Sequence, residues 1–136
     1  RQYPVRRLAE HRQNILEELV ALRKEIAPDV VFLPCEQDIH QDHKAIHAEG
    51  VRAFKNASLL GYELPWNTLN FAPQLIVGLE DRHMQRKWDM LHAYNSQIVL
   101  GRRYFAKDLV YGLARVRGVQ ANKEFGEGFQ VIRLNI

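Results

Sequence analysis

The stretch Val30-Val31-Phe32-Leu33-Pro34, followed by Asp38-Ile39-His40-Gln41-Asp42-His43, decides the fold class of this sequence. The first run is short, continuous and apolar, which is typical of a central parallel strand that is covered on both faces. Apolar residues then recur with helical spacing from about residue 42 to residue 56. A buried strand, a polar loop and a helix in this order indicate an α/β protein, in which ligands gather at the carboxyl ends of strands.

The rest of the chain continues the alternation of helices and strands. A single apolar stripe predicts a helix over residues 5–26, because residues 15, 19, 22 and 26 are all Ile or Leu. We also expect helices at 80–97 and 104–115, and strands at 58–64, 71–77 and 129–134. A doubly wound domain starts with a strand, whereas this sequence starts with a helix. We therefore expect residues 1–136 to be the carboxyl-terminal part of one domain, without its first βα elements.

Composition excludes several classes of protein. The 136 residues are 46% hydrophobic, enough for a substantial core, and carry a formal net charge of +3, too small an excess to indicate a nucleic-acid partner. The single cysteine rules out a disulfide framework and a cysteine-cluster zinc site. No apolar run approaches the length of a transmembrane span, and no signal-peptide pattern is present. The simplest expectation is a cytoplasmic protein.

The polar loop holds the candidate chemistry. His40 and His43 lie three residues apart at the start of a helix, so both rings can be aimed at one point. One imidazole can ligate a metal, while the other can carry a proton near neutral pH, because an unperturbed imidazole has a pKa of about 6.5. Asp42 or Asp38 can orient a ring as its hydrogen-bond partner. The alternative is a polar loop with surface histidines.

His43 and His47 form a second pair, one helical turn apart on the same face. This spacing is similar to the His-Glu-x-x-His pattern of zinc proteases, in which a glutamate follows the first histidine. Lys44 stands in that place here, so the template fails. We interpret His47 as a packing residue.

Several motifs of the sequence resemble those of one family, the LmbE-like, or PIG-L, metal-dependent de-N-acetylases. Residues 28–34 with 38–45 are similar to the second conserved block of that family. Similar later segments extend the resemblance over nearly the whole chain: Tyr62-Glu63 with Pro65-Trp66, Lys87 with Tyr94-Asn95-Ser96-Gln97, and Arg117-Gly118 with Glu124-Phe125-Gly126-Glu127-Gly128-Phe129.

The resemblance implies a fold, a reaction and a set of roles. The fold is a Rossmann-like three-layer α/β/α arrangement with a mostly parallel sheet. The reaction is hydrolysis of an N-acetyl group, usually on an N-acetylglucosamine-containing compound, with zinc or another divalent metal as cofactor. His43 would be the metal ligand, His40 would stabilise the oxyanion or protonate the leaving amine, and Asp42 would support that geometry. A homo-oligomer is also implied.

One motif of the family is missing from these residues. The block Ala-His-Pro-Asp-Asp-Glu supplies a second histidine ligand, an aspartate ligand and the general base, and no His-Pro-Asp-Asp occurs here. We therefore expect an incomplete metal site, with the rest in a segment that precedes residue 1. The alternative is an inactive member of the fold that binds a sugar or a partner. A nucleotide-binding fragment is disfavoured, because the sequence has no Gly-x-Gly-x-x-Gly.

Three further residues are candidates for substrate binding. Trp66 follows the motif helix in a loop and can stack on a sugar ring, although a core position would explain it equally well. Arg117 and Glu127 lie in irregular, glycine-containing stretches, where we expect them to line a pocket.

Overall fold

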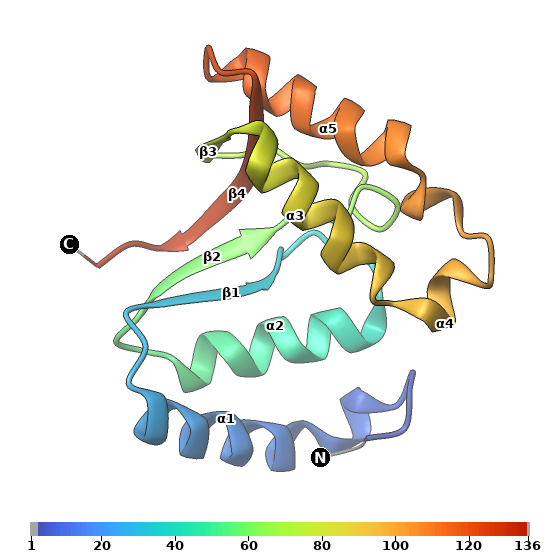
Figure 1. The fold of residues 1–136 in the computed structure, drawn as a ribbon. Helices are drawn as coiled ribbons and strands as arrows, with labels where there is room; N and C mark the ends of the chain where they lie inside the picture. Colours follow the sequence, from blue (N-terminus) through green and yellow to red (C-terminus); the bar gives the residue numbers. More distant parts are fainter. Residues whose placement is uncertain (1–2, 136) are drawn as a thin grey trace. The chain divides into compact units, whose positions relative to one another are not determined.

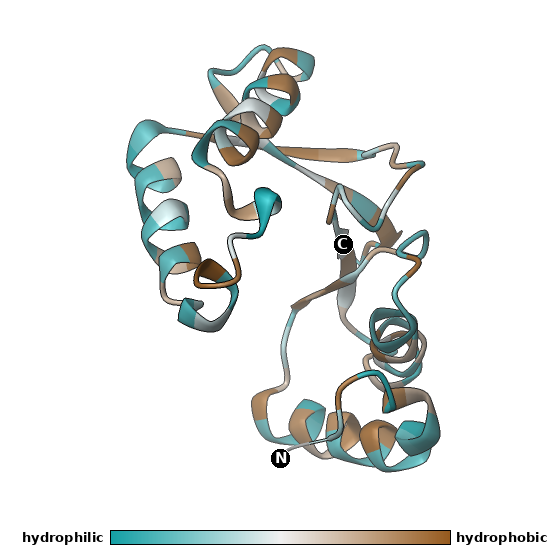
Figure 2. Cartoon of the chain, turned by 90° about the vertical axis from the view of Figure 1, so that its right-hand side faces the viewer, coloured by the Kyte–Doolittle hydropathy of each residue, from teal (hydrophilic) through white to brown (hydrophobic). Residues whose placement is uncertain are grey.

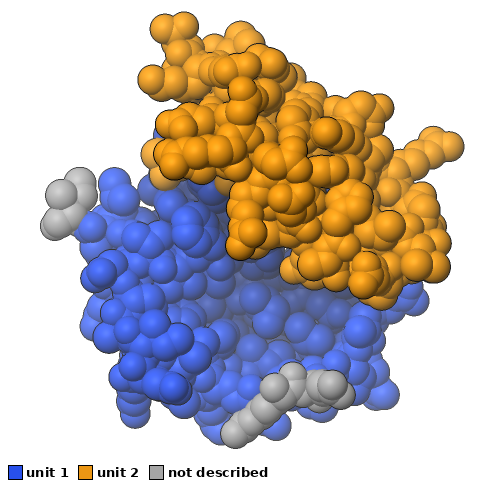
Figure 3. Space-filling view, in the orientation of Figure 1, with its two compact units in different colours: residues 1–74, 129–136 blue, residues 75–128 orange. Residues whose placement is uncertain are grey.

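The computed structural model describes residues 3–135 and shows an α/β fold, as the sequence predicts (Figure 1). The chain divides into two compact units, coloured separately in Figure 3. Unit 1 runs to Gln74 and resumes at Phe129, and unit 2 comprises Leu75–Gly128. That these residues form part of a single deacetylase domain stays a prediction, and each unit is described by itself.

The described residues of unit 1 form two α-helices, a short 3-10 helix, two strands and the end of a third strand. Its elements are η1 (Leu8–His11), α1 (Arg12–Ile26), β1 (Val30–Pro34), α2 (Gln41–Ala53), β2 (Ser58–Tyr62) and the last residues of β4 (Phe125–Arg133). Unit 2 contains β3 (Leu75–Leu79), α3 (Asp81–His92), α4 (Asn95–Ile98), η2 (Arg103–Phe105), α5 (Lys107–Gln120) and the first residues of β4.

The sheet is mixed, whereas the family resemblance implied a mostly parallel one. Its strand order is β1-β2-β4-β3. β1 and β2 are parallel, with Val30 opposite Ser58 and Pro34 opposite Tyr62, and β4 runs antiparallel to β2. The apolar pattern of one strand does not encode the direction in which it pairs, so the direction of β4 could not be predicted from the sequence.

The prediction that β1 is a central strand covered on both faces is wrong for the described residues. β1 lies at one end of the strand order, and its outer edge pairs with none of residues 3–135. Val30 and Phe32 are 46% and 55% exposed, whereas Leu33 is buried. One face of β1 packs on α2, and the other leaves Phe32 exposed beside the ring of Phe129, 5.3 Å away between centroids.

The core of unit 1 lies between α2, α1 and the β1–β2 pair. It is built from Leu33, Ala53, Phe54 and Leu59, and α1 adds partly buried leucines. Gly50 lets α2 approach β1, because a Cβ there would stand 2.5 Å from Cδ2 of Leu33. This close approach packs the carboxyl-terminal part of α2 against β1 at Leu33.

Several element boundaries differ from the predicted ones for local reasons. The helix predicted from residue 5 begins as α1 at Arg12, because Arg6 has a φ of 68° and residues 8–11 form a 3-10 turn. The helix predicted over 80–97 ends as α3 at His92, and α4 begins after Tyr94, whose ψ is 58°. β3 starts two residues after Pro73, which has no N–H to donate to a strand ladder.

Unit 2 has its own small core. Met84, Ala114 and Phe125 are buried there, with Leu79, Val110 and Tyr111 packed around them. The helices of the chain carry both hydrophobic and hydrophilic residues, as amphipathic surface helices do (Figure 2). Among the described residues, no helix is long and apolar enough to cross a membrane.

Candidate functional site

His40 forms the amino-terminal cap of α2. Its backbone is extended, and its Nδ1 accepts a hydrogen bond from the backbone N–H of Asp42 at 3.2 Å. An imidazole therefore fills the capping role that Ser, Asn or Asp usually has. Because Nδ1 is the acceptor in this contact, a neutral His40 ring carries its proton on Nε2. His40 thus presents a hydrogen-bond donor at the carboxyl end of β1.

Asp38 holds His43 in the opposite tautomer to that of His40. Oδ2 of Asp38 lies 2.7 Å from Nδ1 of His43, and a carboxylate can only accept, so Nδ1 of His43 donates. The neutral His43 ring then has its lone pair on Nε2. Asp38 is 1% exposed and His43 is 30% exposed at the side chain, so a buried carboxylate fixes a ring that reaches the surface. This carboxylate–histidine arrangement is the one that usually supports a metal-ligating imidazole.

The two rings lie together. Oδ1 of Asp38 also accepts the backbone N–H of His40 at 2.8 Å, so one carboxylate fixes both residues. The rings of His40 and His43 are stacked, with centroids 4.5 Å apart and planes inclined by 27°. The result is a pair of imidazoles, one with an N–H donor at Nε2 and one with a lone pair there.

Asp42 supports a different part of unit 1. Its carboxylate is buried and accepts the backbone N–H of Arg6 at 2.6 Å and that of Leu8 at 3.2 Å. Among the described residues, neither imidazole bonds to this carboxylate. Asp42 therefore fastens the turn around Arg6 to the start of α2, and its role in catalysis stays a prediction.

The neighbouring loop contacts are structural. Nδ1 of His47 lies 2.8 Å from the carbonyl oxygen of Pro34 and ties α2 to the end of β1, as expected of a packing residue. The N–H of Ile39 donates to the carbonyl of Asn67 at 3.1 Å, so the loop that carries Trp66 is joined to the histidine loop. Trp66 itself is 42% exposed.

The other two predicted binding residues belong to unit 2. Arg117 is buried and donates to Oε1 of Gln120 at 3.0 Å. Glu127 forms an ion pair with Lys87. Their substrate-binding roles stay predictions, and Glu127 alone of the two lines the cavity described next.

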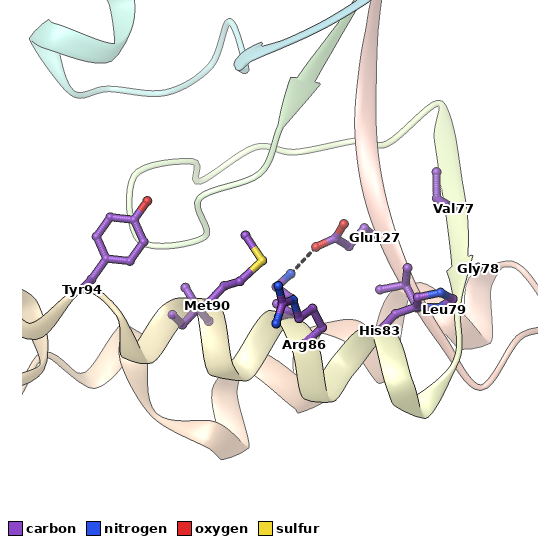
Figure 4. A pocket seen from close by; sticks show the side chains of 10 residues that line it. Val77, Gly78, Leu79, His83, Arg86, Met90, Tyr94 and Glu127 are labelled. Atoms are coloured by element: carbon purple, nitrogen blue, oxygen red, sulfur yellow. Dashed lines mark hydrogen bonds and ion pairs between the residues drawn. The ribbon is translucent and has the colours of Figure 1, made fainter.

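Unit 2 contains a cavity of about 570 Å³ between β3, α3 and β4, which we call the α3 groove (Figure 4). Residues on one face of α3 line it, with Val77 and Leu79 of β3 and Glu127 of β4 around them. The groove was not predicted from the sequence, because helix packing alone explains the pattern of polar and apolar residues in this helix. The available signal was the recurrence of polar and then apolar residues at helical spacing, from His83 to Leu91.

The residues of this chain fit a metal only in part. His43 offers a nitrogen donor held by a buried carboxylate, which is the expected support for a metal ligand. Catalytic zinc takes about three protein ligands. Within residues 3–135, no group of three His, Cys, Asp or Glu side chains is placed to hold a metal ion.

Comparison with solved structures identifies the class of fold. A conserved protein from Thermus thermophilus, TT1542, is similar over 98% of this chain and 65% of its own, with 25% identity and a TM-score of 0.74. 4-Carboxy-2-hydroxymuconate hydratase from Pseudomonas putida KT2440 covers 91% of this chain and 60% of its own, with 16% identity and a TM-score of 0.71.

Two deacetylases share the same fold. The zinc-inhibited form of teicoplanin deacetylase Orf2 covers 95% of this chain and 54% of its own, with 16% identity and a TM-score of 0.70. N,N'-diacetylchitobiose deacetylase from Pyrococcus horikoshii is similar over 89% of this chain and 51% of its own, with 18% identity and a TM-score of 0.53. No family model and no curated protein matches the sequence.

These likenesses confirm, at the level of the fold, the resemblance to the LmbE-like, or PIG-L, family that the motifs indicate. The chain spans 51 to 65% of the length of these four solved structures.

Proposed function

We propose that the intact protein is a metal-dependent N-deacetylase that hydrolyses an N-acetyl group on an N-acetylglucosamine-containing compound. The observation that carries this proposal is the hydrogen bond from Nδ1 of His43 to the buried carboxylate of Asp38. It leaves Nε2 of His43 as a metal donor, next to a stacked His40 that offers a proton. The resemblance of the motif and the fold shared with two deacetylases support the choice of reaction.

Each residue of the pair then has a distinct task. Nε2 of His43 would hold a zinc ion, and Asp38 keeps the lone pair on that nitrogen. A metal bound there supplies a Lewis acid that activates water and polarises the acetyl carbonyl. His40, whose Nδ1 accepts a backbone N–H, would donate a hydrogen bond from Nε2 to the developing oxyanion. Asp42 fastens the turn around Arg6 to the start of α2, which carries His43.

The remaining metal donors and the general base would come from a part of the intact protein outside residues 1–136. The partial donor set of the described residues and the 51 to 65% coverage of the solved structures support this division. From the same resemblance we propose that the intact domain is a Rossmann-like three-layer α/β/α fold and that it forms a homo-oligomer. A cytoplasmic location stays an expectation from the sequence.

The fold alone does not decide the reaction, because a hydratase shares it with the deacetylases. The two reactions are separated by assaying the intact protein for acetate release from N-acetylglucosaminides and for hydration of 4-carboxy-2-hydroxymuconate. We expect acetate release only. His40→Gln should lower kcat with KM nearly unchanged, because a donor that acts in the transition state is lost. Hydration without acetate release would refute the proposal.

The alternative is a sugar-binding module without activity. Exposed Trp66, on the loop joined to the histidine loop, is the feature that favours it. This module would bind N-acetylglucosamine oligomers after EDTA treatment and with His43→Ala, and Trp66→Ala would abolish the binding. The deacetylase proposal predicts instead that chelation stops acetate release.

A further inference from the structure

We propose that the α3 groove of unit 2 binds a small amphiphilic anion, a carboxylate on a medium-length apolar chain. The groove lies entirely within unit 2, so the proposal is independent of the histidine pair and of the deacetylase function. Its volume of about 570 Å³ falls in the range of small-molecule sites.

One face of α3 gives the groove a polar end and an apolar end. Arg86 and Lys87 lie about one turn before Met90 and Leu91, so these residues share a face at i, i+3 or i+4 spacing. From His83 to Leu91 the helix advances about 12 Å at 1.5 Å per residue. Figure 4 shows His83 near one end of the groove, Tyr94 at the other, and Arg86 and Met90 between them. An elongated ligand would lie along α3.

The charges of the polar end favour an anionic head group. Lys87 pairs with Glu127, and Arg86 forms no hydrogen bond or ion pair with any described residue. The two cations and one carboxylate leave one positive charge in excess. His83 adds none as a neutral ring, since its Nδ1 accepts the backbone N–H of Glu80 at 3.0 Å. The Arg86 guanidinium can bind a carboxylate through two parallel hydrogen bonds.

The apolar end suits a hydrocarbon chain. Met90 is 60% exposed and Val77 is 43% exposed, and both line the groove with Leu79 and Leu91. Exposed apolar side chains that gather in one patch indicate a binding site, whereas apolar side chains scattered singly over a surface do not. Methionine adapts its shape to irregular apolar ligands. Burial of these side chains by an alkyl chain would stabilise the complex, while the head group pairs with Arg86.

Sodium decanoate, below its critical micelle concentration, is the probe for this site. The chain has two methionines, so a methyl-labelled sample gives two signals. Met90 lies in the groove, and Met84 is fully buried in the core of unit 2. We expect decanoate to shift the Met90 signal saturably and to leave Met84 unchanged. Decyltrimethylammonium and decyl maltoside should shift Met90 at least tenfold more weakly.

Three variants make the test specific. Arg86→Gln should weaken decanoate binding about tenfold or more, which is the loss expected for a charge-assisted hydrogen bond. Met90→Glu should abolish binding. Because this variant lacks the Met90 signal, its binding is measured from the methyl signals of Leu91. Arg102→Gln removes the same charge from an exposed position outside the groove and should bind as the wild type does. An unchanged Met84 signal reports that unit 2 is folded.

The proposal is overturned by any of three results. These are an unresponsive Met90, an equal response to the cationic analogue, and equal affinities of the Arg86→Gln and Arg102→Gln variants. Retention on phosphatidylglycerol vesicles without any response to monomeric decanoate would identify a membrane surface as the partner and would also overturn it.

Discussion

Asp38 accepts a hydrogen bond from Nδ1 of His43 at 2.7 Å, and with its other oxygen it accepts the backbone N–H of His40. A single buried carboxylate thereby sets the tautomer of one imidazole and the position of the other. Asp42, the aspartate between the two histidines, bonds instead to the backbone of residues 6 and 8. The two aspartates of the motif therefore have separate tasks.

Asp38→Asn should disturb the site without unfolding the chain. An asparagine can present its NH₂ group to Nδ1 of His43, which would move the ring proton to Nε2 and remove the lone pair from that nitrogen. We expect nitrogen NMR of the His43 ring to show this change of tautomer. In the intact protein, zinc affinity should fall about 10- to 100-fold, as for other partners of ligating histidines. Glu36→Gln, an exposed change in the same loop, is the control, and an equal loss there would contradict the role of Asp38.

Asp42→Ala should free the amino-terminal turn. The variant loses two hydrogen bonds from backbone N–H groups to a buried carboxylate, and each bond to a charged group is worth about 1.5–3 kcal/mol. We expect faster hydrogen exchange at the amides of Arg6 and Leu8 and a lower free energy of unfolding. Asp42→Asn keeps an acceptor and should lose less. Unchanged exchange at both amides in Asp42→Ala would show that the turn is held by other contacts.

Glu49 predicts a non-additive pair of mutations. Its side chain is fully buried and forms ion pairs with Arg12 of α1 and Arg52 of α2, both about half exposed. Either arginine alone still compensates the buried charge, so Arg12→Gln and Arg52→Gln should each cost little. The double variant leaves the carboxylate unpaired, and we expect about 3–5 kcal/mol of destabilisation in urea unfolding. Additive costs in the double-mutant cycle would contradict this explanation.

Two glycines of α5 predict opposite effects of the same substitution. A Cβ at Gly118 would stand 2.7 Å from the backbone Cα of Phe125, whereas a Cβ at Gly112 would meet nothing within 4 Å. Gly118→Ala should therefore destabilise the chain by about 1–3 kcal/mol through overpacking. Gly112→Ala should stabilise it by about 0.5–1 kcal/mol, because Ala is the better helix former. Thermal unfolding of both variants gives the comparison, and equal effects would show that α5 does not approach β4 closely.

Much of unit 1 follows from local sequence signals. The apolar run at 30–34 predicts β1, and the helical spacing after it predicts α2 with the histidines at its start. The exposure of β1 could not be predicted from the sequence, because an apolar run looks the same whether or not another strand pairs with its edge. The separate roles of Asp38 and Asp42 were also hidden. In the sequence, both carboxylates are close enough to bond to an imidazole. Asp42 instead accepts N–H groups that lie more than thirty residues away in sequence, and no local pattern indicates this.

The most direct test of the proposed function is the metal dependence of acetate release and its requirement for His43. Acetate released from an N-acetylglucosaminide is measured for the intact protein after EDTA treatment and after zinc is restored. We expect the wild type to lose activity on chelation and to regain it with zinc, and His43→Ala to stay inactive in both conditions. His47→Gln, a change of another α2 histidine that bonds to the Pro34 carbonyl, should keep most of the activity. Full activity of His43→Ala, or activity that survives complete removal of the metal, would contradict the proposal.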